Sequence, residues 1–244
     1  THLFSSAASD VYKRQNLNLI KDQTLHLEIE SYLVGGYVRD ILISRDCKDI
    51  DIMTIGEPYK LVENISKKKG FSDFKIFKNF GTAAINFKKF NYEFVGARKE
   101  SYNKSSRNPE VSPGLFQDDM KRRDFTINAL AVSMNQDYGE LIDTFNGLED
   151  LKNKLIKTCD DPHKTFDDDP LRMMRAIRFA TQLNFDIEES TFESICNNAE
   201  RIKIISQERI TDELNKIILS EKPSYGFKLL YVSGILKHIF PEMN

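Results

Sequence analysis

Two aspartates separated by one residue, Asp49 and Asp51, have the type and spacing to do chemistry. They lie in DIDIMTI (residues 49–55), an alternating, β-branched segment that predicts a strand. On a strand, residues i and i+2 point to the same face, so both carboxylates would share one side. Carboxylates paired in this way can hold divalent metal ions, and two-metal sites suit phosphoryl and nucleotidyl transfer. Such a pair is common on strands, so on its own it is a weak indication.

A pair of glycines, Gly35 and Gly36, precedes the aspartates in the segment LVGGYVRD. The hydrophobic pattern predicts a strand before the glycines and a short helix after them. This junction lets the backbone approach a phosphate and directs a helix N-terminus at it. Arg39 would lie in the first turn of that helix, within reach of the same anion. A Gly-Gly pair is more often only a turn, so the indication comes from GG-x-VRD and D-x-D together.

The elements that must position these residues form an α+β pattern up to about residue 150 and a helical pattern from about residue 165. In the first part we expect a helix from Pro58 to Gly70 and strands in FKIFK, TAAINF, YEFVGA and ELIDTF. The polar segment 99–118 predicts a long mobile loop, and DDMKRRDFTINALAVSM (118–134) predicts one helix. The second part predicts helices in DDDPLRMMRAIRFATQL (167–183), STFESICNNA, SQERITDELNKIILS and PSYGFKLLYVS.

Together these motifs resemble the nucleotidyltransferase superfamily, in the branch of tRNA CCA-adding enzymes and bacterial poly(A) polymerases. KRRDFTINALAV (121–132) resembles the family's sugar-recognition motif, and DDPLRMMRAIRFATQL (168–183) resembles the motif that reads the incoming base. SQERITDEL (206–214) is similar to a later helical motif, and the resemblance covers roughly residues 30 to 240. It implies an α+β fold: a polymerase beta-like head with a small mixed or antiparallel sheet, followed by an all-helical domain.

The resemblance also implies a reaction, in which CMP and AMP from CTP and ATP are added without a template to the 3′ end of tRNA. Asp49 and Asp51 would hold two Mg²⁺ ions. Glu93 in NYEFVGA is the candidate third carboxylate, with a solvent-facing strand glutamate as the alternative.

The sugar motif supplies three candidate nucleotide-binding residues, Arg123, Asp124 and Asn128. In the family interpretation Arg123 contacts phosphate or ribose. Asp124 and Asn128 would hydrogen-bond ribose hydroxyls and so select NTP over dNTP. The alternatives are a capping or surface carboxylate for Asp124 and a satisfied buried amide for Asn128.

The base motif places Asp169, Arg172, Arg175 and Arg178 at intervals of three residues, which on one helix would share a side. A salt-bridged helix face is the plain interpretation. In the family interpretation Asp169 accepts from an exocyclic amine and Arg172 donates to the adjacent ring acceptor. Cytosine and adenine share that edge pattern and uracil and guanine do not, so one pair could admit CTP and ATP. Arg175 would support this pair or the phosphates.

Other functions remain open within and beyond this family. A poly(A) polymerase, or an enzyme that adds only CC or only A, would carry the same motifs. A non-catalytic RNA-binding relative is the alternative from another class, although both aspartates of D-x-D are present.

The charge of the 244-residue chain is unevenly distributed, because a net charge of −2 hides a basic segment. Residues 67–123 contain 14 basic and 6 acidic side chains, a local charge of +8, which would favour RNA. No apolar run approaches the length of a membrane span. The three cysteines, Cys47, Cys159 and Cys196, lie far apart, which suggests a reducing cytoplasm.

The expected organisation has three parts. Residues 1–24 are expected to be a non-native or disordered leader, residues 25–150 the catalytic head, and residues 151–244 a helical nucleotide-reading and RNA-binding domain. That last domain is expected to be truncated at its C-terminus.

Overall fold

The computed structural model describes residues 11–68, 73–77, 81–87, 90–101 and 110–243. These residues fall into two compact units. The first comprises the described residues up to Ser101, Glu110–Arg122 and Asn128–Thr144, and the second comprises Arg123–Ile127 and Phe145–Asn244. In this division the chain passes to the second unit at Phe145, and residues 123–127 of the sugar motif also belong to that unit. The expected boundary between residues 150 and 151 stays a prediction.

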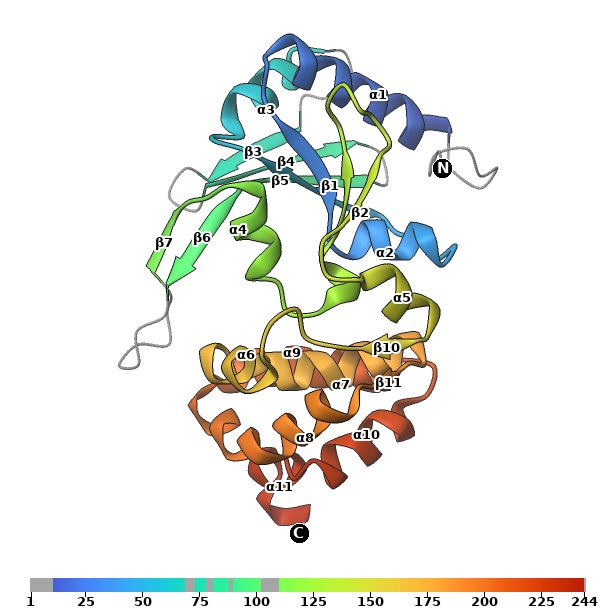
Figure 1. Cartoon of the computed structure of the whole chain (residues 1–244), viewed down its shortest axis with the longest axis vertical. Coiled ribbons are helices and arrows are strands. Elements are labelled where there is room, and N and C mark those ends of the chain that lie inside the picture. The colour runs from blue at the N-terminus through green and yellow to red at the C-terminus, as the bar shows by residue number, and fades with distance from the viewer. Residues whose placement is uncertain (1–10, 69–72, 78–80, 88–89, 102–109, 244) are drawn as a thin grey trace. The chain divides into compact units, whose positions relative to one another are not determined.

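The first unit is built on a seven-stranded mixed sheet with the order β3-β4-β5-β2-β1-β8-β9 (Figure 1). Only the β2–β5 pair is parallel among its pairings. The strands are β1 (Ser31–Val34), β2 (Asp49–Thr54), β3 (Phe74–Phe77), β4 (Thr82–Phe87), β5 (Phe90–Gly96), β8 (Leu130–Ser133) and β9 (Leu141–Asp143). The expected mixed sheet is confirmed, as are the six strand segments that the sequence predicted, which form β1 to β5 and β9.

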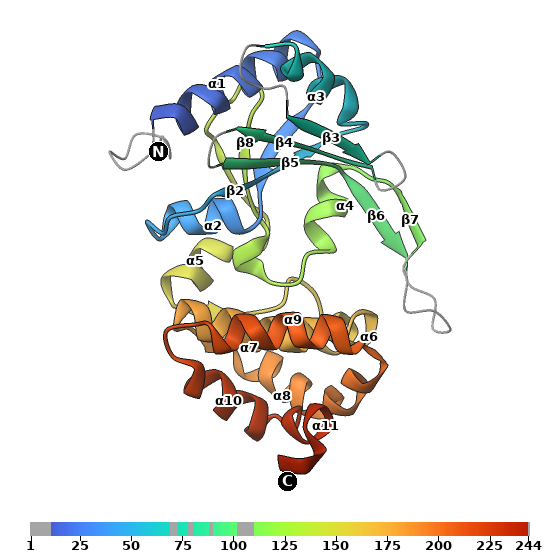
Figure 2. The same cartoon turned by 180° about the vertical axis from the view of Figure 1, so that it is seen from behind.

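Helices α1 (Val11–His26) and α3 (Tyr59–Ser66) lie over the same side of this sheet (Figures 1 and 2). Asn16 of α1 donates to the hydroxyl of Tyr92 on β5 at 2.9 Å, and Leu17 and Ile20 are almost fully buried. The disorder expected for residues 11–24 is therefore wrong, because their apolar side chains pack against the head. Residues 1–10 lie outside the described residues. Helix α3 ends at Ser66, earlier than expected, and Gly70 is also outside the described residues.

The segment predicted to be one loop, 99–118, contains regular structure at both ends. Strands β6 (Arg98–Ser101) and β7 (Glu110–Pro113) pair antiparallel, and α4 (Phe116–Lys121) follows. Gly114 follows β7, and a Cβ at this position would lie 2.7 Å from backbone atoms of Arg98 and Lys99. The close approach of these two backbone segments therefore requires glycine. Residues 102–109 lie outside the described residues.

The single helix predicted over residues 118–134 is wrong. Helix α4 ends at Lys121, a 3-10 turn covers Thr126–Asn128, and Leu130–Ser133 forms the inner strand β8. The residues of β8 are all buried, and the strand lies between β1 and β9. A short buried apolar segment fits a helix or a strand by its pattern, so pairing with the neighbouring strands selects the strand. The Asp124 carboxylate also accepts the Phe125 N–H, a local bond that competes with helix formation.

The second unit is mostly helical, as expected (Figure 2). Its helices are α5 (Gly147–Lys152), α6 (Pro162–Asp168), α7 (Leu171–Leu183), α8 (Glu189–Asn198), α9 (Gln207–Ile218), α10 (Pro223–Val232) and α11 (Leu236–Ile239). Between these helices lie two short strands, β10 (Leu155–Ile156) and β11 (Asp186–Ile187), which pair in parallel. A 3-10 helix covers Ala199–Ile204.

The predicted helix over residues 167–183 is broken in two at Pro170. Asp169 has an extended backbone, which is the conformation that a following proline favours. Asp169 therefore does not share a helix with the three arginines, all of which lie on α7. Among the described residues, none of the helices is both long and apolar enough to cross a membrane.

Candidate active site

The two aspartates open β2, the strand at the centre of the sheet. Ile50 is fully buried and pairs with Tyr92, whose hydroxyl binds α1, so these side chains face the helix-covered side. By alternation, Asp49 and Asp51 point to the opposite face. Asp49 is exposed and Asp51 is half-buried, and Glu93 lies beside Asp51 in the parallel register. The expected shared face of the two aspartates is therefore present.

This pair fits Mg²⁺ by the chemistry of its donors. Mg²⁺ prefers oxygen ligands and is commonly held by one or two carboxylates together with waters and substrate phosphates. Among the described residues no three acidic, histidine or cysteine side chains converge to form a complete protein site. The aspartate pair supplies two carboxylates of the kind that Mg²⁺ prefers, while the exposed Glu93 stays a prediction as a third ligand.

The glycine pair stands next to the aspartates, because β1 and β2 are antiparallel. Val34, the last residue of β1, pairs with Asp51, so the chain turns at Gly35 beside the start of β2. Gly35 has φ 72° and ψ −145°, a backbone conformation that residues other than glycine rarely adopt. Helix α2 (Gly36–Leu42) begins directly after it.

Replacing Gly35 by alanine is expected to lower the free energy of unfolding by about 1–3 kcal/mol, the typical cost of such strain. Gly36→Ala is the matched control, because Gly36 lies in the helix and its nearest contact would be the flexible Arg39 side chain at 3.4 Å. Denaturant unfolding of both variants, followed by circular dichroism, measures the difference. Equal stability of the two variants would contradict this role for Gly35.

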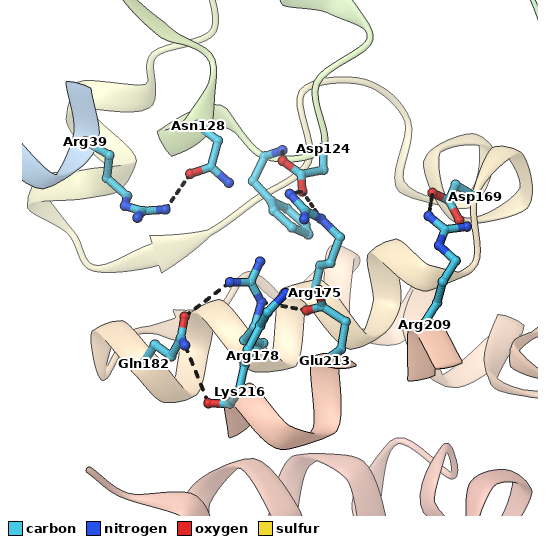
Figure 3. Close-up of polar contacts among 11 residues, drawn as sticks. Arg39, Asp124, Asn128, Asp169, Arg175, Arg178, Gln182, Arg209, Glu213 and Lys216 are labelled. Carbon is cyan, nitrogen blue, oxygen red and sulfur yellow. Dashed lines mark hydrogen bonds and ion pairs between the residues drawn. The ribbon is translucent and has the colours of Figure 1, made fainter. Parts of the chain in front are cut away.

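Arg39 and Asn128 meet in the first unit, although the sequence assigned them to different motifs. The Arg39 Nη1 donates to Asn128 Oδ1 at 2.7 Å (Figure 3). Its Nε donates to Asp40 Oδ1 at 2.8 Å, and Nη2 lies 2.7 Å from the same oxygen. All three residues are buried.

Asp124 and Arg175 form an ion pair in the second unit. Nε and Nη2 of Arg175 both lie 2.7 Å from Asp124 Oδ2 (Figure 3). The Asp124 carboxylate raises the pKa of Arg175 against the opposing effect of burial. The sequence offered a ribose contact or a capping group for Asp124. The structure adds a third use, the anchoring of Arg175.

Arg178 is paired in a similar way with Glu213 of α9. Its Nε lies 2.6 Å from Glu213 Oε2 (Figure 3). Its guanidinium carbon lies 4.0 Å from the centre of the Phe179 ring. Burial lowers the pKa of Arg178, while Glu213 opposes that shift. Phe179 also packs edge-on against Phe125 of the sugar motif, with ring centres 5.9 Å apart.

Asp169 contacts α9 and the start of α7. Its Oδ1 accepts the Leu171 N–H at 3.1 Å. Its Oδ2 lies 3.4 Å from Nη2 of Arg209 (Figure 3). Arg172 is half-buried and, like Arg123 and Asp124, lies within electrostatic range of Cys159. Burial raises the pKa of the Cys159 thiol. The second unit therefore brings Arg123, Asp124 and Arg172 into one neighbourhood.

A further charged network joins the β6–β7 hairpin to α4. Arg122 contacts Asp119 at 2.5 Å and Glu100 at 3.2 Å, and Arg98 also contacts Glu100 at 3.2 Å. The Asp119 and Glu100 side chains are almost completely buried. Two cations of the basic segment 67–123 are therefore neutralised internally, whereas Lys67, Lys68 and Lys121 are exposed.

Sequence reasoning missed several of these partners, namely Asp40, Glu100, Asp119, Arg122, Arg209 and Glu213. For two of them a signal existed, since Arg209 and Glu213 are four residues apart in SQERITDEL and so share a helix face. Asp40 adjoins Arg39, and Asp119 lies three residues before Arg122, so these two pairs are local as well. Glu100 meets Arg122 through tertiary pairing that no local pattern indicates.

The mixed sheet, its central pair of aspartates and the glycine turn beside them define a nucleotidyltransferase head fold. The model of the poly(A) polymerase head domain matches residues 31–157, and that of the probable RNA- and SrmB-binding site of polymerase A matches residues 184–244. The chain belongs to the poly(A) polymerase head-domain family.

Similar proteins with known names include a CCA-adding enzyme of Lactobacillus helveticus, 41% identical over 82% of this chain and 49% of that protein. An A-adding tRNA nucleotidyltransferase of Aquifex aeolicus is 38% identical over 83% of this chain and 24% of its own length. A crystal structure of a tRNA nucleotidyltransferase with a primer tRNA and an incoming ATP analogue matches with a TM-score of 0.80 and 32% identity. That match covers 91% of this chain and 62% of the other. The chain spans about half or less of the length of these curated relatives.

Proposed function

We propose that the protein represented by this chain adds nucleotides from CTP and ATP to the 3′ end of tRNA without a template, in the cytoplasm. The observation that carries the proposal is the placement of Asp49 and Asp51 on one face of β2, beside the Gly35 turn. The named relatives and the RNA-binding-site match to residues 184–244 support tRNA as the substrate.

In this proposal the residues of the first unit bind the reacting groups. Asp49 and Asp51 hold Mg²⁺, which supplies activation of the primer hydroxyl and neutralisation of the triphosphate when bound. The backbone of Gly35 and Gly36 lies beside the triphosphate, where the lack of side chains allows close approach. The carboxylates thus bind the metal that the nucleotide shares, and the turn orients the nucleotide.

The second unit selects the base in this proposal. Asp169 accepts from the exocyclic amine of cytosine or adenine, and Arg172 donates to the neighbouring ring nitrogen. Arg175 and Arg178 stay fixed by Asp124 and Glu213 and support the pocket with positive charge. Arg123 is assigned to the phosphate or ribose.

The test is incubation of the chain with tRNA lacking CCA, Mg²⁺ and each NTP singly, followed by sequencing of the products. CCA, CC-only, A-only and poly(A) products distinguish the members of this family. Binding of RNA without incorporation of any nucleotide would favour the non-catalytic alternative. Failure to incorporate either CTP or ATP, with tRNA bound, would overturn the proposal.

Arg172→Ala is expected to relax the choice of base, because the alanine no longer rejects the N–H edge of uracil. The expected loss of discrimination between CTP and UTP is on the order of 10–100-fold, since the site then lacks one specific hydrogen bond. The ratio of kcat/KM for the two nucleotides measures it. Lys164→Ala is the control, as Lys164 is an exposed residue of α6; an unchanged ratio in Arg172→Ala would remove Arg172 from base recognition.

A further inference from the structure

Arg39 is turned inward in this structure, whereas the sequence suggested a contact with phosphate. Only 6% of the residue is exposed, and its guanidinium lies against Gly36, whose Cβ position would be 3.4 Å from Nη2. Asp40 neutralises its charge within the same helix. A guanidinium held by these contacts is poorly placed to follow a mobile triphosphate.

The hydrogen bond between Arg39 and Asn128 fixes which end of the Asn128 amide faces Arg39. Arginine carries five N–H donors and no acceptor, so the atom of the Asn128 amide that faces Arg39 must be its oxygen. The NH₂ end of the amide therefore points away from Arg39 (Figure 3). Asn128 is 6% exposed and is the last residue of the 3-10 turn, so burial restricts the conformations of its side chain.

The pairing connects two segments that are far apart in the chain. Arg39 lies on α2, which follows the glycine turn, and Asn128 ends the 3-10 turn two residues before the start of β8. Helix α2 packs against β1, β2 and β8, so it has a rigid base. The orientation of Asn128 thus depends on an arginine that is itself fixed by the sheet.

We propose that Arg39 is a positioning residue for sugar recognition, which acts by holding Asn128 with its amide NH₂ directed as a donor for a ribose hydroxyl. The inference rests on the proposed function, because it assumes that a nucleotide binds near the sugar motif. Arg39 thereby sets the preference for ribonucleotides over deoxyribonucleotides without contacting the nucleotide.

The experiment compares binding of CTP and dCTP, by calorimetry in the presence of Mg²⁺, for the full chain and its Arg39→Lys variant. Lysine keeps the charge but cannot hold both Asp40 and Asn128 in the planar geometry of a guanidinium. We expect the CTP/dCTP affinity ratio to fall roughly tenfold, the effect of one hydrogen bond of about 1.4 kcal/mol. Arg45→Lys, at an exposed arginine after the same helix, should leave the ratio unchanged.

A second variant keeps the proposal testable if Arg39→Lys does not fold. Asn128→Asp retains a partner for Arg39 but replaces the donor by an acceptor, and it should also abolish the ribose preference. In the Arg39→Lys/Asn128→Asp double variant the ratio should equal that of Asn128→Asp alone, because Arg39 acts through Asn128.

The outcomes separate this inference from the proposed function. Equal weakening of CTP and dCTP binding by Arg39→Lys would make Arg39 a phosphate ligand and overturn the inference. An unchanged ratio in Asn128→Asp would overturn it as well. Nucleotide binding with the expected ratios but no addition to tRNA would count against the proposed function alone.

Discussion

Replacing Asp49 or Asp51 by alanine is expected to reduce the rate of nucleotide addition about 1,000-fold or more. Loss of a carboxylate from a metal site removes several kcal/mol of transition-state stabilisation, and each 1.4 kcal/mol corresponds to a factor of ten. The folded state should survive both changes, because Asp49 is exposed and Asp51 is half-buried at the start of the strand. Single-turnover kinetics with a radiolabelled nucleotide measure the chemical step.

Two companion variants sharpen this result. Asp46→Ala changes an exposed aspartate in the loop before β2 and should keep full activity. Glu93→Gln tests the third carboxylate, and a loss comparable with that of Asp51→Ala would assign Glu93 to the metal. Incorporation that persists in Asp49→Ala and Asp51→Ala would remove the catalytic assignment from this face of the sheet.

Glu213→Ala is expected to destabilise the second unit by about 3–5 kcal/mol, because it leaves the Arg178 guanidinium buried without its counterion. The two side chains are 5% and 12% exposed and meet at 2.6 Å, so water replaces the lost partner poorly. Glu213→Gln, which keeps the shape, separates the charge from the volume. Chemical denaturation, monitored for a separate transition of each unit, gives the change in unfolding free energy.

Lys216 provides the matched control for this ion pair. Its Nζ lies 3.3 Å from the other oxygen of Glu213, but its side chain is 48% exposed. Lys216→Met should therefore cost no more than about 1 kcal/mol, as is usual for exposed ion pairs. Similar losses in Glu213→Ala and Lys216→Met would show that burial of the Arg178–Glu213 pair contributes nothing special.

Features with a short-range physical signature were predictable from the sequence. Alternation in DIDIMTI indicated both the strand and the shared face of the aspartates, and Gly35 does occupy a backbone conformation that favours glycine. The helices of the second unit follow the periodicity of their apolar residues, apart from the break at Pro170. A proline inside the predicted segment 167–183 was itself a signal for that break.

The errors arose where tertiary contacts decide the local structure. LAVS of β8 fits a helix or a strand by pattern, and only its position between two strands of the sheet selects the strand. Strands β6 and β7 are mostly polar and β7 ends at Pro113, so buried ion pairs of Arg122 stabilise this pair of strands rather than apolar alternation. The contacts of Arg39 with Asn128 and of Asp124 with Arg175 were not predictable in the same way, because the partners are 89 and 51 residues apart.

The path of the chain through the sugar motif limits how the protein can be divided. The chain leaves the first unit after Arg122, contributes five residues to the second, and returns at Asn128. A single cut after Thr144 would therefore leave Phe125, which is fully buried in the intact chain, on the fragment that lacks its packing partner Phe179. The same cut would separate Asp124 from Arg175. We therefore expect that one cut cannot separate a folded head from the rest of the chain. Proteolysis after Thr144 should yield no fragment that stays folded in solution. Exchange of heads between relatives must carry residues 123–127 together with their contact residues Asp150 of α5 and Arg175 and Phe179 of α7.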